Sequence, residues 1–295
     1  MLRHYFITSR FLLYFHCMNF ICLNGKHFPA EEPVLMADNR GYRYGDGLFE
    51  TMKMVKGKII LEKFHLDRLS NGIKLLKFAI PPFFRSEISQ QVSRLCKKNK
   101  CEDLARIRLS LFRGNGALQD QHKNCQYLVE CWPADPALNQ INKTGLAIDI
   151  FPDMQKACDP FSNLKTANYL PYIMASQYAS KHRLDDCLVT NIHGHVADAT
   201  IANIFLVKNK LVITPALSEG CVNGVMRRYL IQKLKTSDFD LREGVVTKND
   251  LEAFDEVFLT NALKGIRWVK SFRKKRYDNT TTLNIYEDLV MPLYR

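Results

Sequence analysis

The sequence contains no C-x-x-C pair, no internal repeat and no low-complexity run. Without closely spaced cysteine pairs, a zinc ribbon and a thioredoxin-like motif are excluded. The nine cysteines are scattered and odd in number, which fits reduced thiols in the cytoplasm better than a disulfide framework. His193 and His195 flank a glycine without an evident third ligand, so we expect a polar hairpin turn there and no metal site.

A nucleic-acid-binding motif is also missing, although the net charge is +12. Lysine and arginine are spread along the chain, so the charge indicates solubility or a small anionic ligand rather than nucleic acid. The apolar stretch at residues 6–20 is interrupted by Arg10 and His16. It is too short to span a membrane and no small-residue cleavage site follows it. We therefore interpret residues 1–17 as a loosely ordered extension or a start assigned too far upstream.

The composition itself is that of a globular protein with a real core. Hydrophobic residues make up 46% and charged residues 24% of 295 residues, which suffices for one large domain or two modest ones. The polar, breaker-rich segment 133–142 is the best candidate for a linker. We expect a first domain over residues 18–135 and a second over residues 142–295.

Hydrophobic spacing outlines the elements of both predicted domains. In the first, we expect short strands over 19–61 with turns at 24–25 and 56–57, helices over 62–77 and 84–98, and strands over 104–112 and 126–132. In the second, we expect strands over 145–151, 187–190, 204–207, 211–213 and 257–260, a helix over 165–182 and another after Gly224.

The segment 162–171 (SNLKTANYLP) places Lys165 at the mouth of a predicted helix, among small and apolar residues. A buried lysine loses its proton more readily than an exposed one, and a neutral amine can form a Schiff base with an aldehyde cofactor. About thirty residues later, Asp198 lies in the segment 194–205 (GHVADATIANIF). Because a carboxylate can keep a pyridine nitrogen protonated, the two residues together indicate pyridoxal 5'-phosphate (PLP) chemistry.

Other residues are suited to a phosphate group. A phosphate prefers a guanidinium fork, which Arg68 can supply, and free backbone N–H groups at a helix start. Gly224 allows close approach, and Val225 and Met226 would present such N–H groups. A second set of donors is expected at Thr260, Asn261 and Ala262.

These segments occur in an order that resembles the class IV aminotransferases, the fold-type IV PLP enzymes. The matching segments are 43–51 (RYGDGLFET), 65–69 (HLDRL), Lys165 with Asn168, 194–205, 222–227 (VNGVMR) and 259–263 (LTNAL). The resemblance implies an α/β (α+β) fold with a small N-terminal α/β domain and a larger C-terminal domain around a barrel-like sheet. It also implies that PLP lies at the domain interface and that the enzyme is a homodimer.

The resemblance assigns roles to individual residues. Lys165 would carry PLP, Asp198 would hold its ring nitrogen, and Tyr169 would face it. Residues expected near the substrate are Tyr44, Glu50, and one of Arg108 and Arg113, which would bind a carboxylate. One departure stands out: the family normally has Glu where this chain has Asp198, so the shorter carboxylate must come closer or act through water.

Two reactions remain open. The first is transamination between an amino acid and a 2-oxo acid; the second is the 4-amino-4-deoxychorismate lyase reaction, which releases pyruvate and 4-aminobenzoate. The spacing of Lys165 and Asn168 resembles the D-amino acid aminotransferase and lyase branches, and 222–227 and 260–263 resemble the lyase branch. Residues 49–51 and 168–169 resemble the aminotransferases, which the sequence favours slightly. A non-catalytic binding protein on the same fold is the remote alternative, supported only by Asp198.

Overall fold

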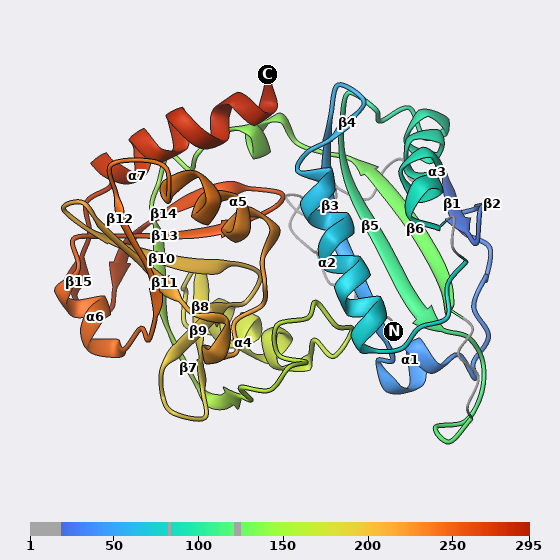
Figure 1. Ribbon diagram of the computed structural model, residues 1–295, viewed down its shortest axis with the longest axis horizontal. Coiled ribbons are helices and arrows are strands. Elements are labelled where there is room, and N and C mark those ends of the chain that lie inside the picture. The colour runs from blue at the N-terminus through green and yellow to red at the C-terminus, as the bar shows by residue number, and fades with distance from the viewer. Residues whose placement is uncertain (1–18, 82–83, 121–124) are drawn as a thin grey trace, which may run out of the picture.

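The computed structural model describes residues 19–81, 84–120 and 125–295, so the expectation for residues 1–17 lies outside the described chain. Two sheets organise these residues, with the first drawn on the right and the second on the left of Figure 1. No helix among the described residues is long and apolar enough to cross a membrane.

The first sheet is antiparallel, with strand order β2-β1-β6-β5-β3-β4. Helices α2 and α3 cover one of its faces (Figure 1), and together they enclose an apolar core. The bounds are β1 Phe20–Leu23, β2 Lys26–Pro29, α1 Arg40–Tyr44, β3 Gly47–Val55, β4 Lys58–Ile59, α2 Glu62–Leu75, α3 Phe84–Lys98, β5 Leu104–Arg113 and β6 Cys125–Pro133. The predicted helices and the alternating strand over 104–112 are confirmed.

The second sheet is mixed, with strand order β12-β11-β10-β13-β14-β7-β8-β9 and β15 paired to β14. Its far strand β9 comes back against β10 and β11, so the sheet curls into the expected barrel-like form. The strands are β7 Leu146–Lys156, β8 Asp186–Asn191, β9 Val196–Ala199, β10 Asn203–Lys208, β11 Leu211–Pro215, β12 Asp240–Gly244, β13 Glu256–Asn261, β14 Gly265–Phe272 and β15 Lys275–Arg276. The helices are α4 Leu170–Lys181, α5 Val225–Leu234, α6 Lys248–Ala253 and α7 Thr280–Ile285.

The predicted helix over 165–182 is wrong at its start, because α4 begins at Leu170. Pro171 suits the first turn of a helix, where a missing N–H costs nothing. Residues 165–167 pair with the start of β3: Phe49 N donates to Lys165 O at 3.0 Å and Ala167 N to Gly47 O at 2.9 Å. Lys165 therefore lies on a short strand-like bridge between the two sheets.

Both sheets also share apolar packing. Val55, at the end of β3, is buried in the same cluster as Phe205 and Phe258 of the second sheet. The predicted linker contains a short 3-10 helix, Pro136–Asn139, and the polypeptide then enters β7. Asn142 is fixed at this entry, because Trp268 Nε1 donates to its carbonyl at 2.8 Å.

Gly145 provides a test of this junction. A Cβ at Gly145 would lie 2.4 Å from the Trp268 ring, whereas a Cβ at Gly244 would meet nothing within 4 Å. We expect Gly145→Ala to lower the free energy of unfolding by about 1–3 kcal/mol through overpacking, and Gly244→Ala to change it by less than ~0.5 kcal/mol. Urea unfolding measures both; equal effects would contradict the close packing.

Candidate functional site

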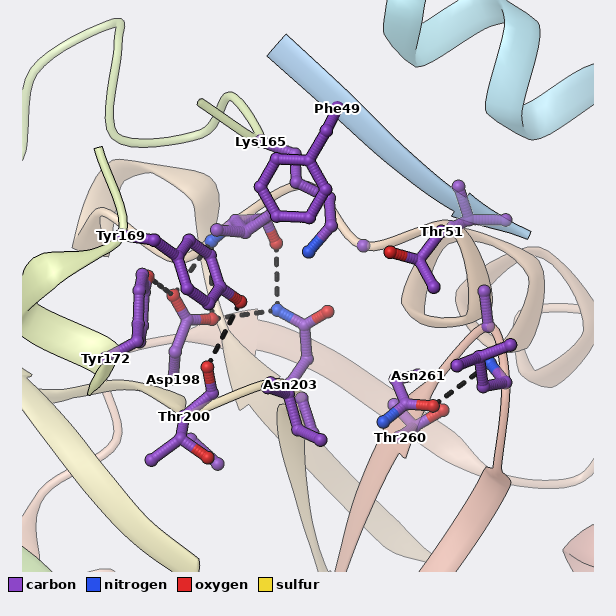
Figure 2. A pocket seen from close by; sticks show the side chains of 18 of the residues that line it. Phe49, Thr51, Lys165, Tyr169, Tyr172, Asp198, Thr200, Asn203, Thr260 and Asn261 are labelled. Atoms are coloured by element: carbon purple, nitrogen blue, oxygen red, sulfur yellow. Dashed lines mark hydrogen bonds between the residues drawn. The ribbon is translucent and has the colours of Figure 1, made fainter. Parts of the chain in front are cut away.

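A cavity of about 390 Å³ opens between the two sheets. Its walls come from β3 and β5 of the first sheet, from β9, β10 and β13 of the second, and from the segments before α4 and α5. Lys165, Asp198, Arg68 and Thr260 all line it, although they are far apart in sequence. Figure 2 shows Lys165 and Phe49 on one side and Thr260 and Asn261 on another.

The amine of Lys165 is held among aromatic rings. Its Nζ lies 4.3 Å from the centroid of Phe49 and 5.3 Å from that of Tyr169. Burial lowers the pKa of Lys165 to about 7, and the positive charges of Arg68 and Arg108 act in the same direction. A substantial fraction of this amine is therefore neutral at physiological pH and can act as a nucleophile or a base.

Asp198 lies on β9 and is 2% exposed. Its oxygens accept hydrogen bonds from Lys156 Nζ at 2.6 Å, Tyr172 OH at 2.9 Å, Asn203 Nδ2 at 3.0 Å and the backbone N of Val222 at 3.1 Å. Figure 2 shows the tyrosine and asparagine bonds converging on the carboxylate. Because a carboxylate offers about four acceptor sites, these donors fill it.

Arg68 is held rigidly from behind by Glu50. Its Nε donates to Glu50 Oε1 at 2.8 Å and its Nη2 to Oε2, while Nη1 reaches Asn223 O at 3.2 Å. Burial raises the pKa of Glu50, but Arg68 and His65 outweigh that effect and hold the pKa at about 2. Since Glu50 is then a carboxylate, His65 Nδ1 must carry the hydrogen of their 2.6 Å contact.

The floor of the cavity has free donors. Helix α5 begins after Gly224 without a side-chain cap, so its first N–H groups lack the usual partner. A Cβ at Gly224 would lie 1.9 Å from Asn203 Oδ1, which shows how closely the backbone approaches there. The Oγ1 of Thr260 is buried without a hydrogen-bond partner among the described residues. Together with Arg68, these groups form a cradle suited to an anion.

Two arginines of β5 face the cavity side by side. Arg106 and Arg108 are two residues apart and therefore lie on the same face of the strand. The guanidinium of Arg108 stacks on Phe49 at 4.1 Å and lies 3.9 Å from Glu130. Arg106 stacks on Trp132 at 5.4 Å. Both cations are thus placed by aromatic rings at the wall of the cavity.

Most of the predicted site residues line the cavity. These are Lys165, Arg68, Tyr169, Asp198, Gly224, Val225, Thr260, Asn261, Ala262 and Arg108. Met226 does not, because its side chain is buried in the core behind α5, although its backbone N–H belongs to the uncapped turn.

Three residues expected near the substrate lie elsewhere. Tyr44 is 40% exposed on α1. Arg113 pairs with Asp46 and donates to Leu76 O, so it ties α1, α2 and β5 together. Glu50 points behind Arg68, as described, and acts through it. The placements of Arg113 and Glu50 follow from charged partners, Asp46 and Arg68, that the sequence pattern did not identify.

Sequence reasoning also missed several lining residues: Thr51, Arg106, Tyr172, Thr200 and Asn203. Arg106 could have been found, since it alternates with Arg108 on the predicted strand. Lys156 carried no such signal, because its contact with Asp198 depends on the curl of the second sheet.

Comparison with known proteins gives the same picture. The family model for amino-transferase class IV matches residues 47–272. The chain belongs to this family. Its enzymes use PLP, and the chain is accordingly an enzyme rather than a binding protein on the same fold. The family match also covers every segment that lines the cavity, so the cavity is the family's candidate active site.

Relatives with different activities are about equally similar. A putative branched-chain-amino-acid aminotransferase of Methanocaldococcus jannaschii is 29% identical over 83% of this chain and 85% of its own. An aminodeoxychorismate lyase of Bacillus subtilis is 27% identical over 83% and 84%. The solved branched-chain aminotransferase of Thermoproteus uzoniensis with norvaline superposes with a TM-score of 0.85 at 21% identity, covering 93% of this chain and 94% of its own.

The residues present fit PLP at its phosphate end. The partnerless Thr260 hydroxyl, the uncapped α5 and the N–H groups of Arg68 that Glu50 does not bind would supply the donors that a phosphate needs. At the nitrogen end, Asp198 would supply the charge, but its oxygens already accept hydrogen bonds from Lys156, Tyr172 and Asn203. A ring nitrogen approaching Asp198 would have to share or replace one of these donors.

The low pKa of Lys165 makes a direct prediction for the protein without cofactor. Acylation of its amine should rise with a midpoint near pH 7, because the neutral form reacts and the charged form does not. Pulse labelling with acetic anhydride followed by peptide mass spectrometry measures it, and Lys165→Arg identifies the peptide signal. A midpoint above about pH 9 would show an ordinary lysine.

The fork of Arg68 makes a second prediction. Arg68→Lys keeps the charge but loses both the paired hydrogen bonds to Glu50 that orient the side chain and the remaining guanidinium N–H groups, so the Kd for PLP should rise roughly 10- to 100-fold. Arg85→Lys is the matched control, because the exposed Arg85 pairs with Asp67 outside the cavity. Absorbance titration gives both constants. Equal affinities for the two variants would remove Arg68 from the phosphate cradle.

Proposed function

We propose that this chain is a PLP-dependent aminotransferase that moves the amino group of an amino acid to a 2-oxo acid by means of Lys165. The observation that carries the proposal is a buried lysine with a pKa of about 7, placed between an anion cradle and a buried carboxylate. The family match and the M. jannaschii relative support the same reaction.

The position of each residue in the cavity determines its proposed role. PLP, when bound, supplies an electron sink for the bond that breaks at the amino acid's Cα. Arg68, Gly224 and Thr260 would hold its phosphate, and Asp198 would bring negative charge to its nitrogen. Lys165 would bond to the cofactor, then take and return a proton with its released Nζ.

The arginine pair would bind the substrate's acidic groups. Arg108 is stacked on Phe49, next to Lys165, so its guanidinium can hold an α-carboxylate close to the amine. Arg106, one step along the same strand face, would bind a second carboxylate. We therefore propose a dicarboxylic amino acid as one of the two amino-group partners.

The arginine pair also favours a second candidate, the 4-amino-4-deoxychorismate lyase reaction. That substrate carries two carboxylates, one on its ring and one on the group released as pyruvate. The B. subtilis relative has this activity in its name. The apolar side chains of Ile173, Ile201 and Leu263 at the cavity wall would suit a carbon ring.

An absorbance titration separates the two reactions. Single L- and D-amino acids, added without a 2-oxo acid to the PLP-loaded protein, should convert its visible band to the pyridoxamine form if the chain is an aminotransferase. We expect a dicarboxylic amino acid to respond best. Arg106→Gln should lower kcat/KM for it about 10- to 100-fold, with little change for a monocarboxylic one. A band that no amino acid moves, with pyruvate released from aminodeoxychorismate, would establish the lyase.

We also propose that the enzyme is a cytoplasmic homodimer. Eight cysteines of the described chain are all free, which fits a reducing compartment. Met36, Tyr42 and Leu118 are 68%, 79% and 66% exposed. Their segments adjoin, since Gly116 N donates to Asp38 O at 3.1 Å. Exposed apolar side chains gathered in one place are typical of a protein–protein contact.

Light scattering after gel filtration tests the dimer. The expected mass is twice the 34.1 kDa of one chain. Tyr42→Ser combined with Leu118→Ser should shift the protein to the monomer, whereas Val245→Ser, at another apolar residue that is 48% exposed, should not. A wild-type monomer at micromolar concentration would contradict the proposal.

A further inference from the structure

Three cysteine thiols meet in the core of the first sheet, away from the cavity. Cys96, Cys101 and Cys131 are 0%, 4% and 0% exposed, and their sulfurs all lie within 4.8 Å of one another. The sequence predicts no metal site, because their spacing matches no familiar cysteine motif. Only the fold brings them together, and the proposed PLP chemistry does not use them.

The backbone around the thiols fixes their positions. Cys96 lies in the last turn of α3, and the chain then reverses through Lys100, which has a left-handed φ of 54°. This reversal lets Cys101 N donate to Cys96 O at 3.0 Å. Cys131 faces both from β6. The three sulfurs therefore come from the end of one helix, the turn after it and one strand.

The sulfur spacing is compatible with a tetrahedral metal ion. The sulfurs of Cys101 and Cys131 are 3.7 Å apart. Zinc–thiolate bonds of about 2.3 Å at tetrahedral angles place neighbouring sulfurs ~3.8 Å apart. A tetrahedral ion would require only small rotations of the other thiol, because no pair of sulfurs is separated by more than 4.8 Å.

A histidine lies on the same face of the sheet. His27 is directly opposite Cys22, and Cys22 is directly opposite Val129. Paired residues share a face, and so does Cys131, two residues beyond Val129. Nε2 of His27 is buried and has no hydrogen-bond partner among the described residues. An imidazole nitrogen is a standard fourth ligand beside three thiolates. His27 lies outside the group of ligand atoms within 4.8 Å of one another, so its side chain would have to turn toward the sulfurs when an ion binds.

The surroundings also stabilise negative charge on sulfur. Nδ2 of Asn99 donates to Cys131 Sγ at 3.2 Å, as outer-shell groups do around bound metals. Simple apolar packing of three thiols would require neither a donor directed at sulfur nor a partnerless imidazole nearby.

We propose that Cys96, Cys101, Cys131 and His27 form a structural Zn²⁺ site that ties α3 and β6 to the β1–β2 hairpin. Thiolate sulfur and imidazole nitrogen select zinc over hard cations, and four protein ligands leave no open position for catalysis. Any thiol still protonated releases its proton to solvent when the ion binds. The site is independent of the PLP reaction.

The test uses the purified full-length protein, saturated with ZnCl₂ and then dialysed. Elemental analysis should find one zinc per chain. Zinc X-ray absorption should show three sulfurs at about 2.3 Å and one nitrogen at about 2.0 Å. Removing the ion with a chelator should lower Tm by ~5 °C or more.

Variants assign the ligands. Cys131→Ala should bind less than a tenth of an equivalent, while Cys187→Ala, which removes an equally buried thiol outside the cluster, should keep one. His27→Ala should lose the nitrogen and bind zinc at least tenfold more weakly. If Cys131→Ala fails to fold, the zinc X-ray absorption spectrum of the wild type still tests whether sulfur atoms bind the ion. Zinc below a tenth of an equivalent, zinc without sulfur neighbours, or a Cys101–Cys131 disulfide would overturn the proposal.

Discussion

The short pairing between residues 165–167 and the start of β3 is the contact on which the site depends. It consists of two backbone hydrogen bonds, Phe49 N to Lys165 O and Ala167 N to Gly47 O, around the Leu48–Thr166 bridge. Backbone bonds fix the chain direction and the face of each side chain. They therefore place the Lys165 amine over Phe49 at the junction of the two sheets, where the second sheet supplies Asp198 and the first supplies the arginines.

The charged groups around this junction, Glu50, Arg68 and Asp198, are buried and are paired with other protein groups. Glu50 stays ionised in the core because Arg68 and His65 flank it, and Arg68 is thereby fixed at the cavity. Buried ion pairs contribute little net stability compared with apolar packing, so positioning is the better account of this group. The buried ion pair of Lys156 and Asp198 is likewise better explained by positioning than by net stability. Burial lowers the pKa of Lys165 and so keeps its amine close to neutral, and the charges of Arg68 and Arg108 act in the same direction.

Local patterns in the sequence predicted much of this arrangement. Alternation along β5 and the spacing of α3 depend on neighbours in the chain, so their predicted bounds are close to the observed ones. The start of α4 was misplaced because the chain at Lys165 pairs with a strand more than a hundred residues earlier. The role of Glu50 behind Arg68 and the meeting of Cys96 with Cys131 likewise depend on long-range packing. Such contacts leave no periodic signal in one sequence.

The position of β3 also has a consequence for how the protein is made. This strand leaves the ribosome early, but its partner at Thr166 and the aromatic cluster that receives Val55 are synthesised later. Until then, the start of β3 lacks its backbone partner and Val55 at its other end lacks its apolar neighbours. Unpaired strand groups and exposed apolar side chains favour aggregation. The pairing at Thr166 and the packing around Val55 therefore need residues from both halves of the chain, and the active site cannot form within either half alone.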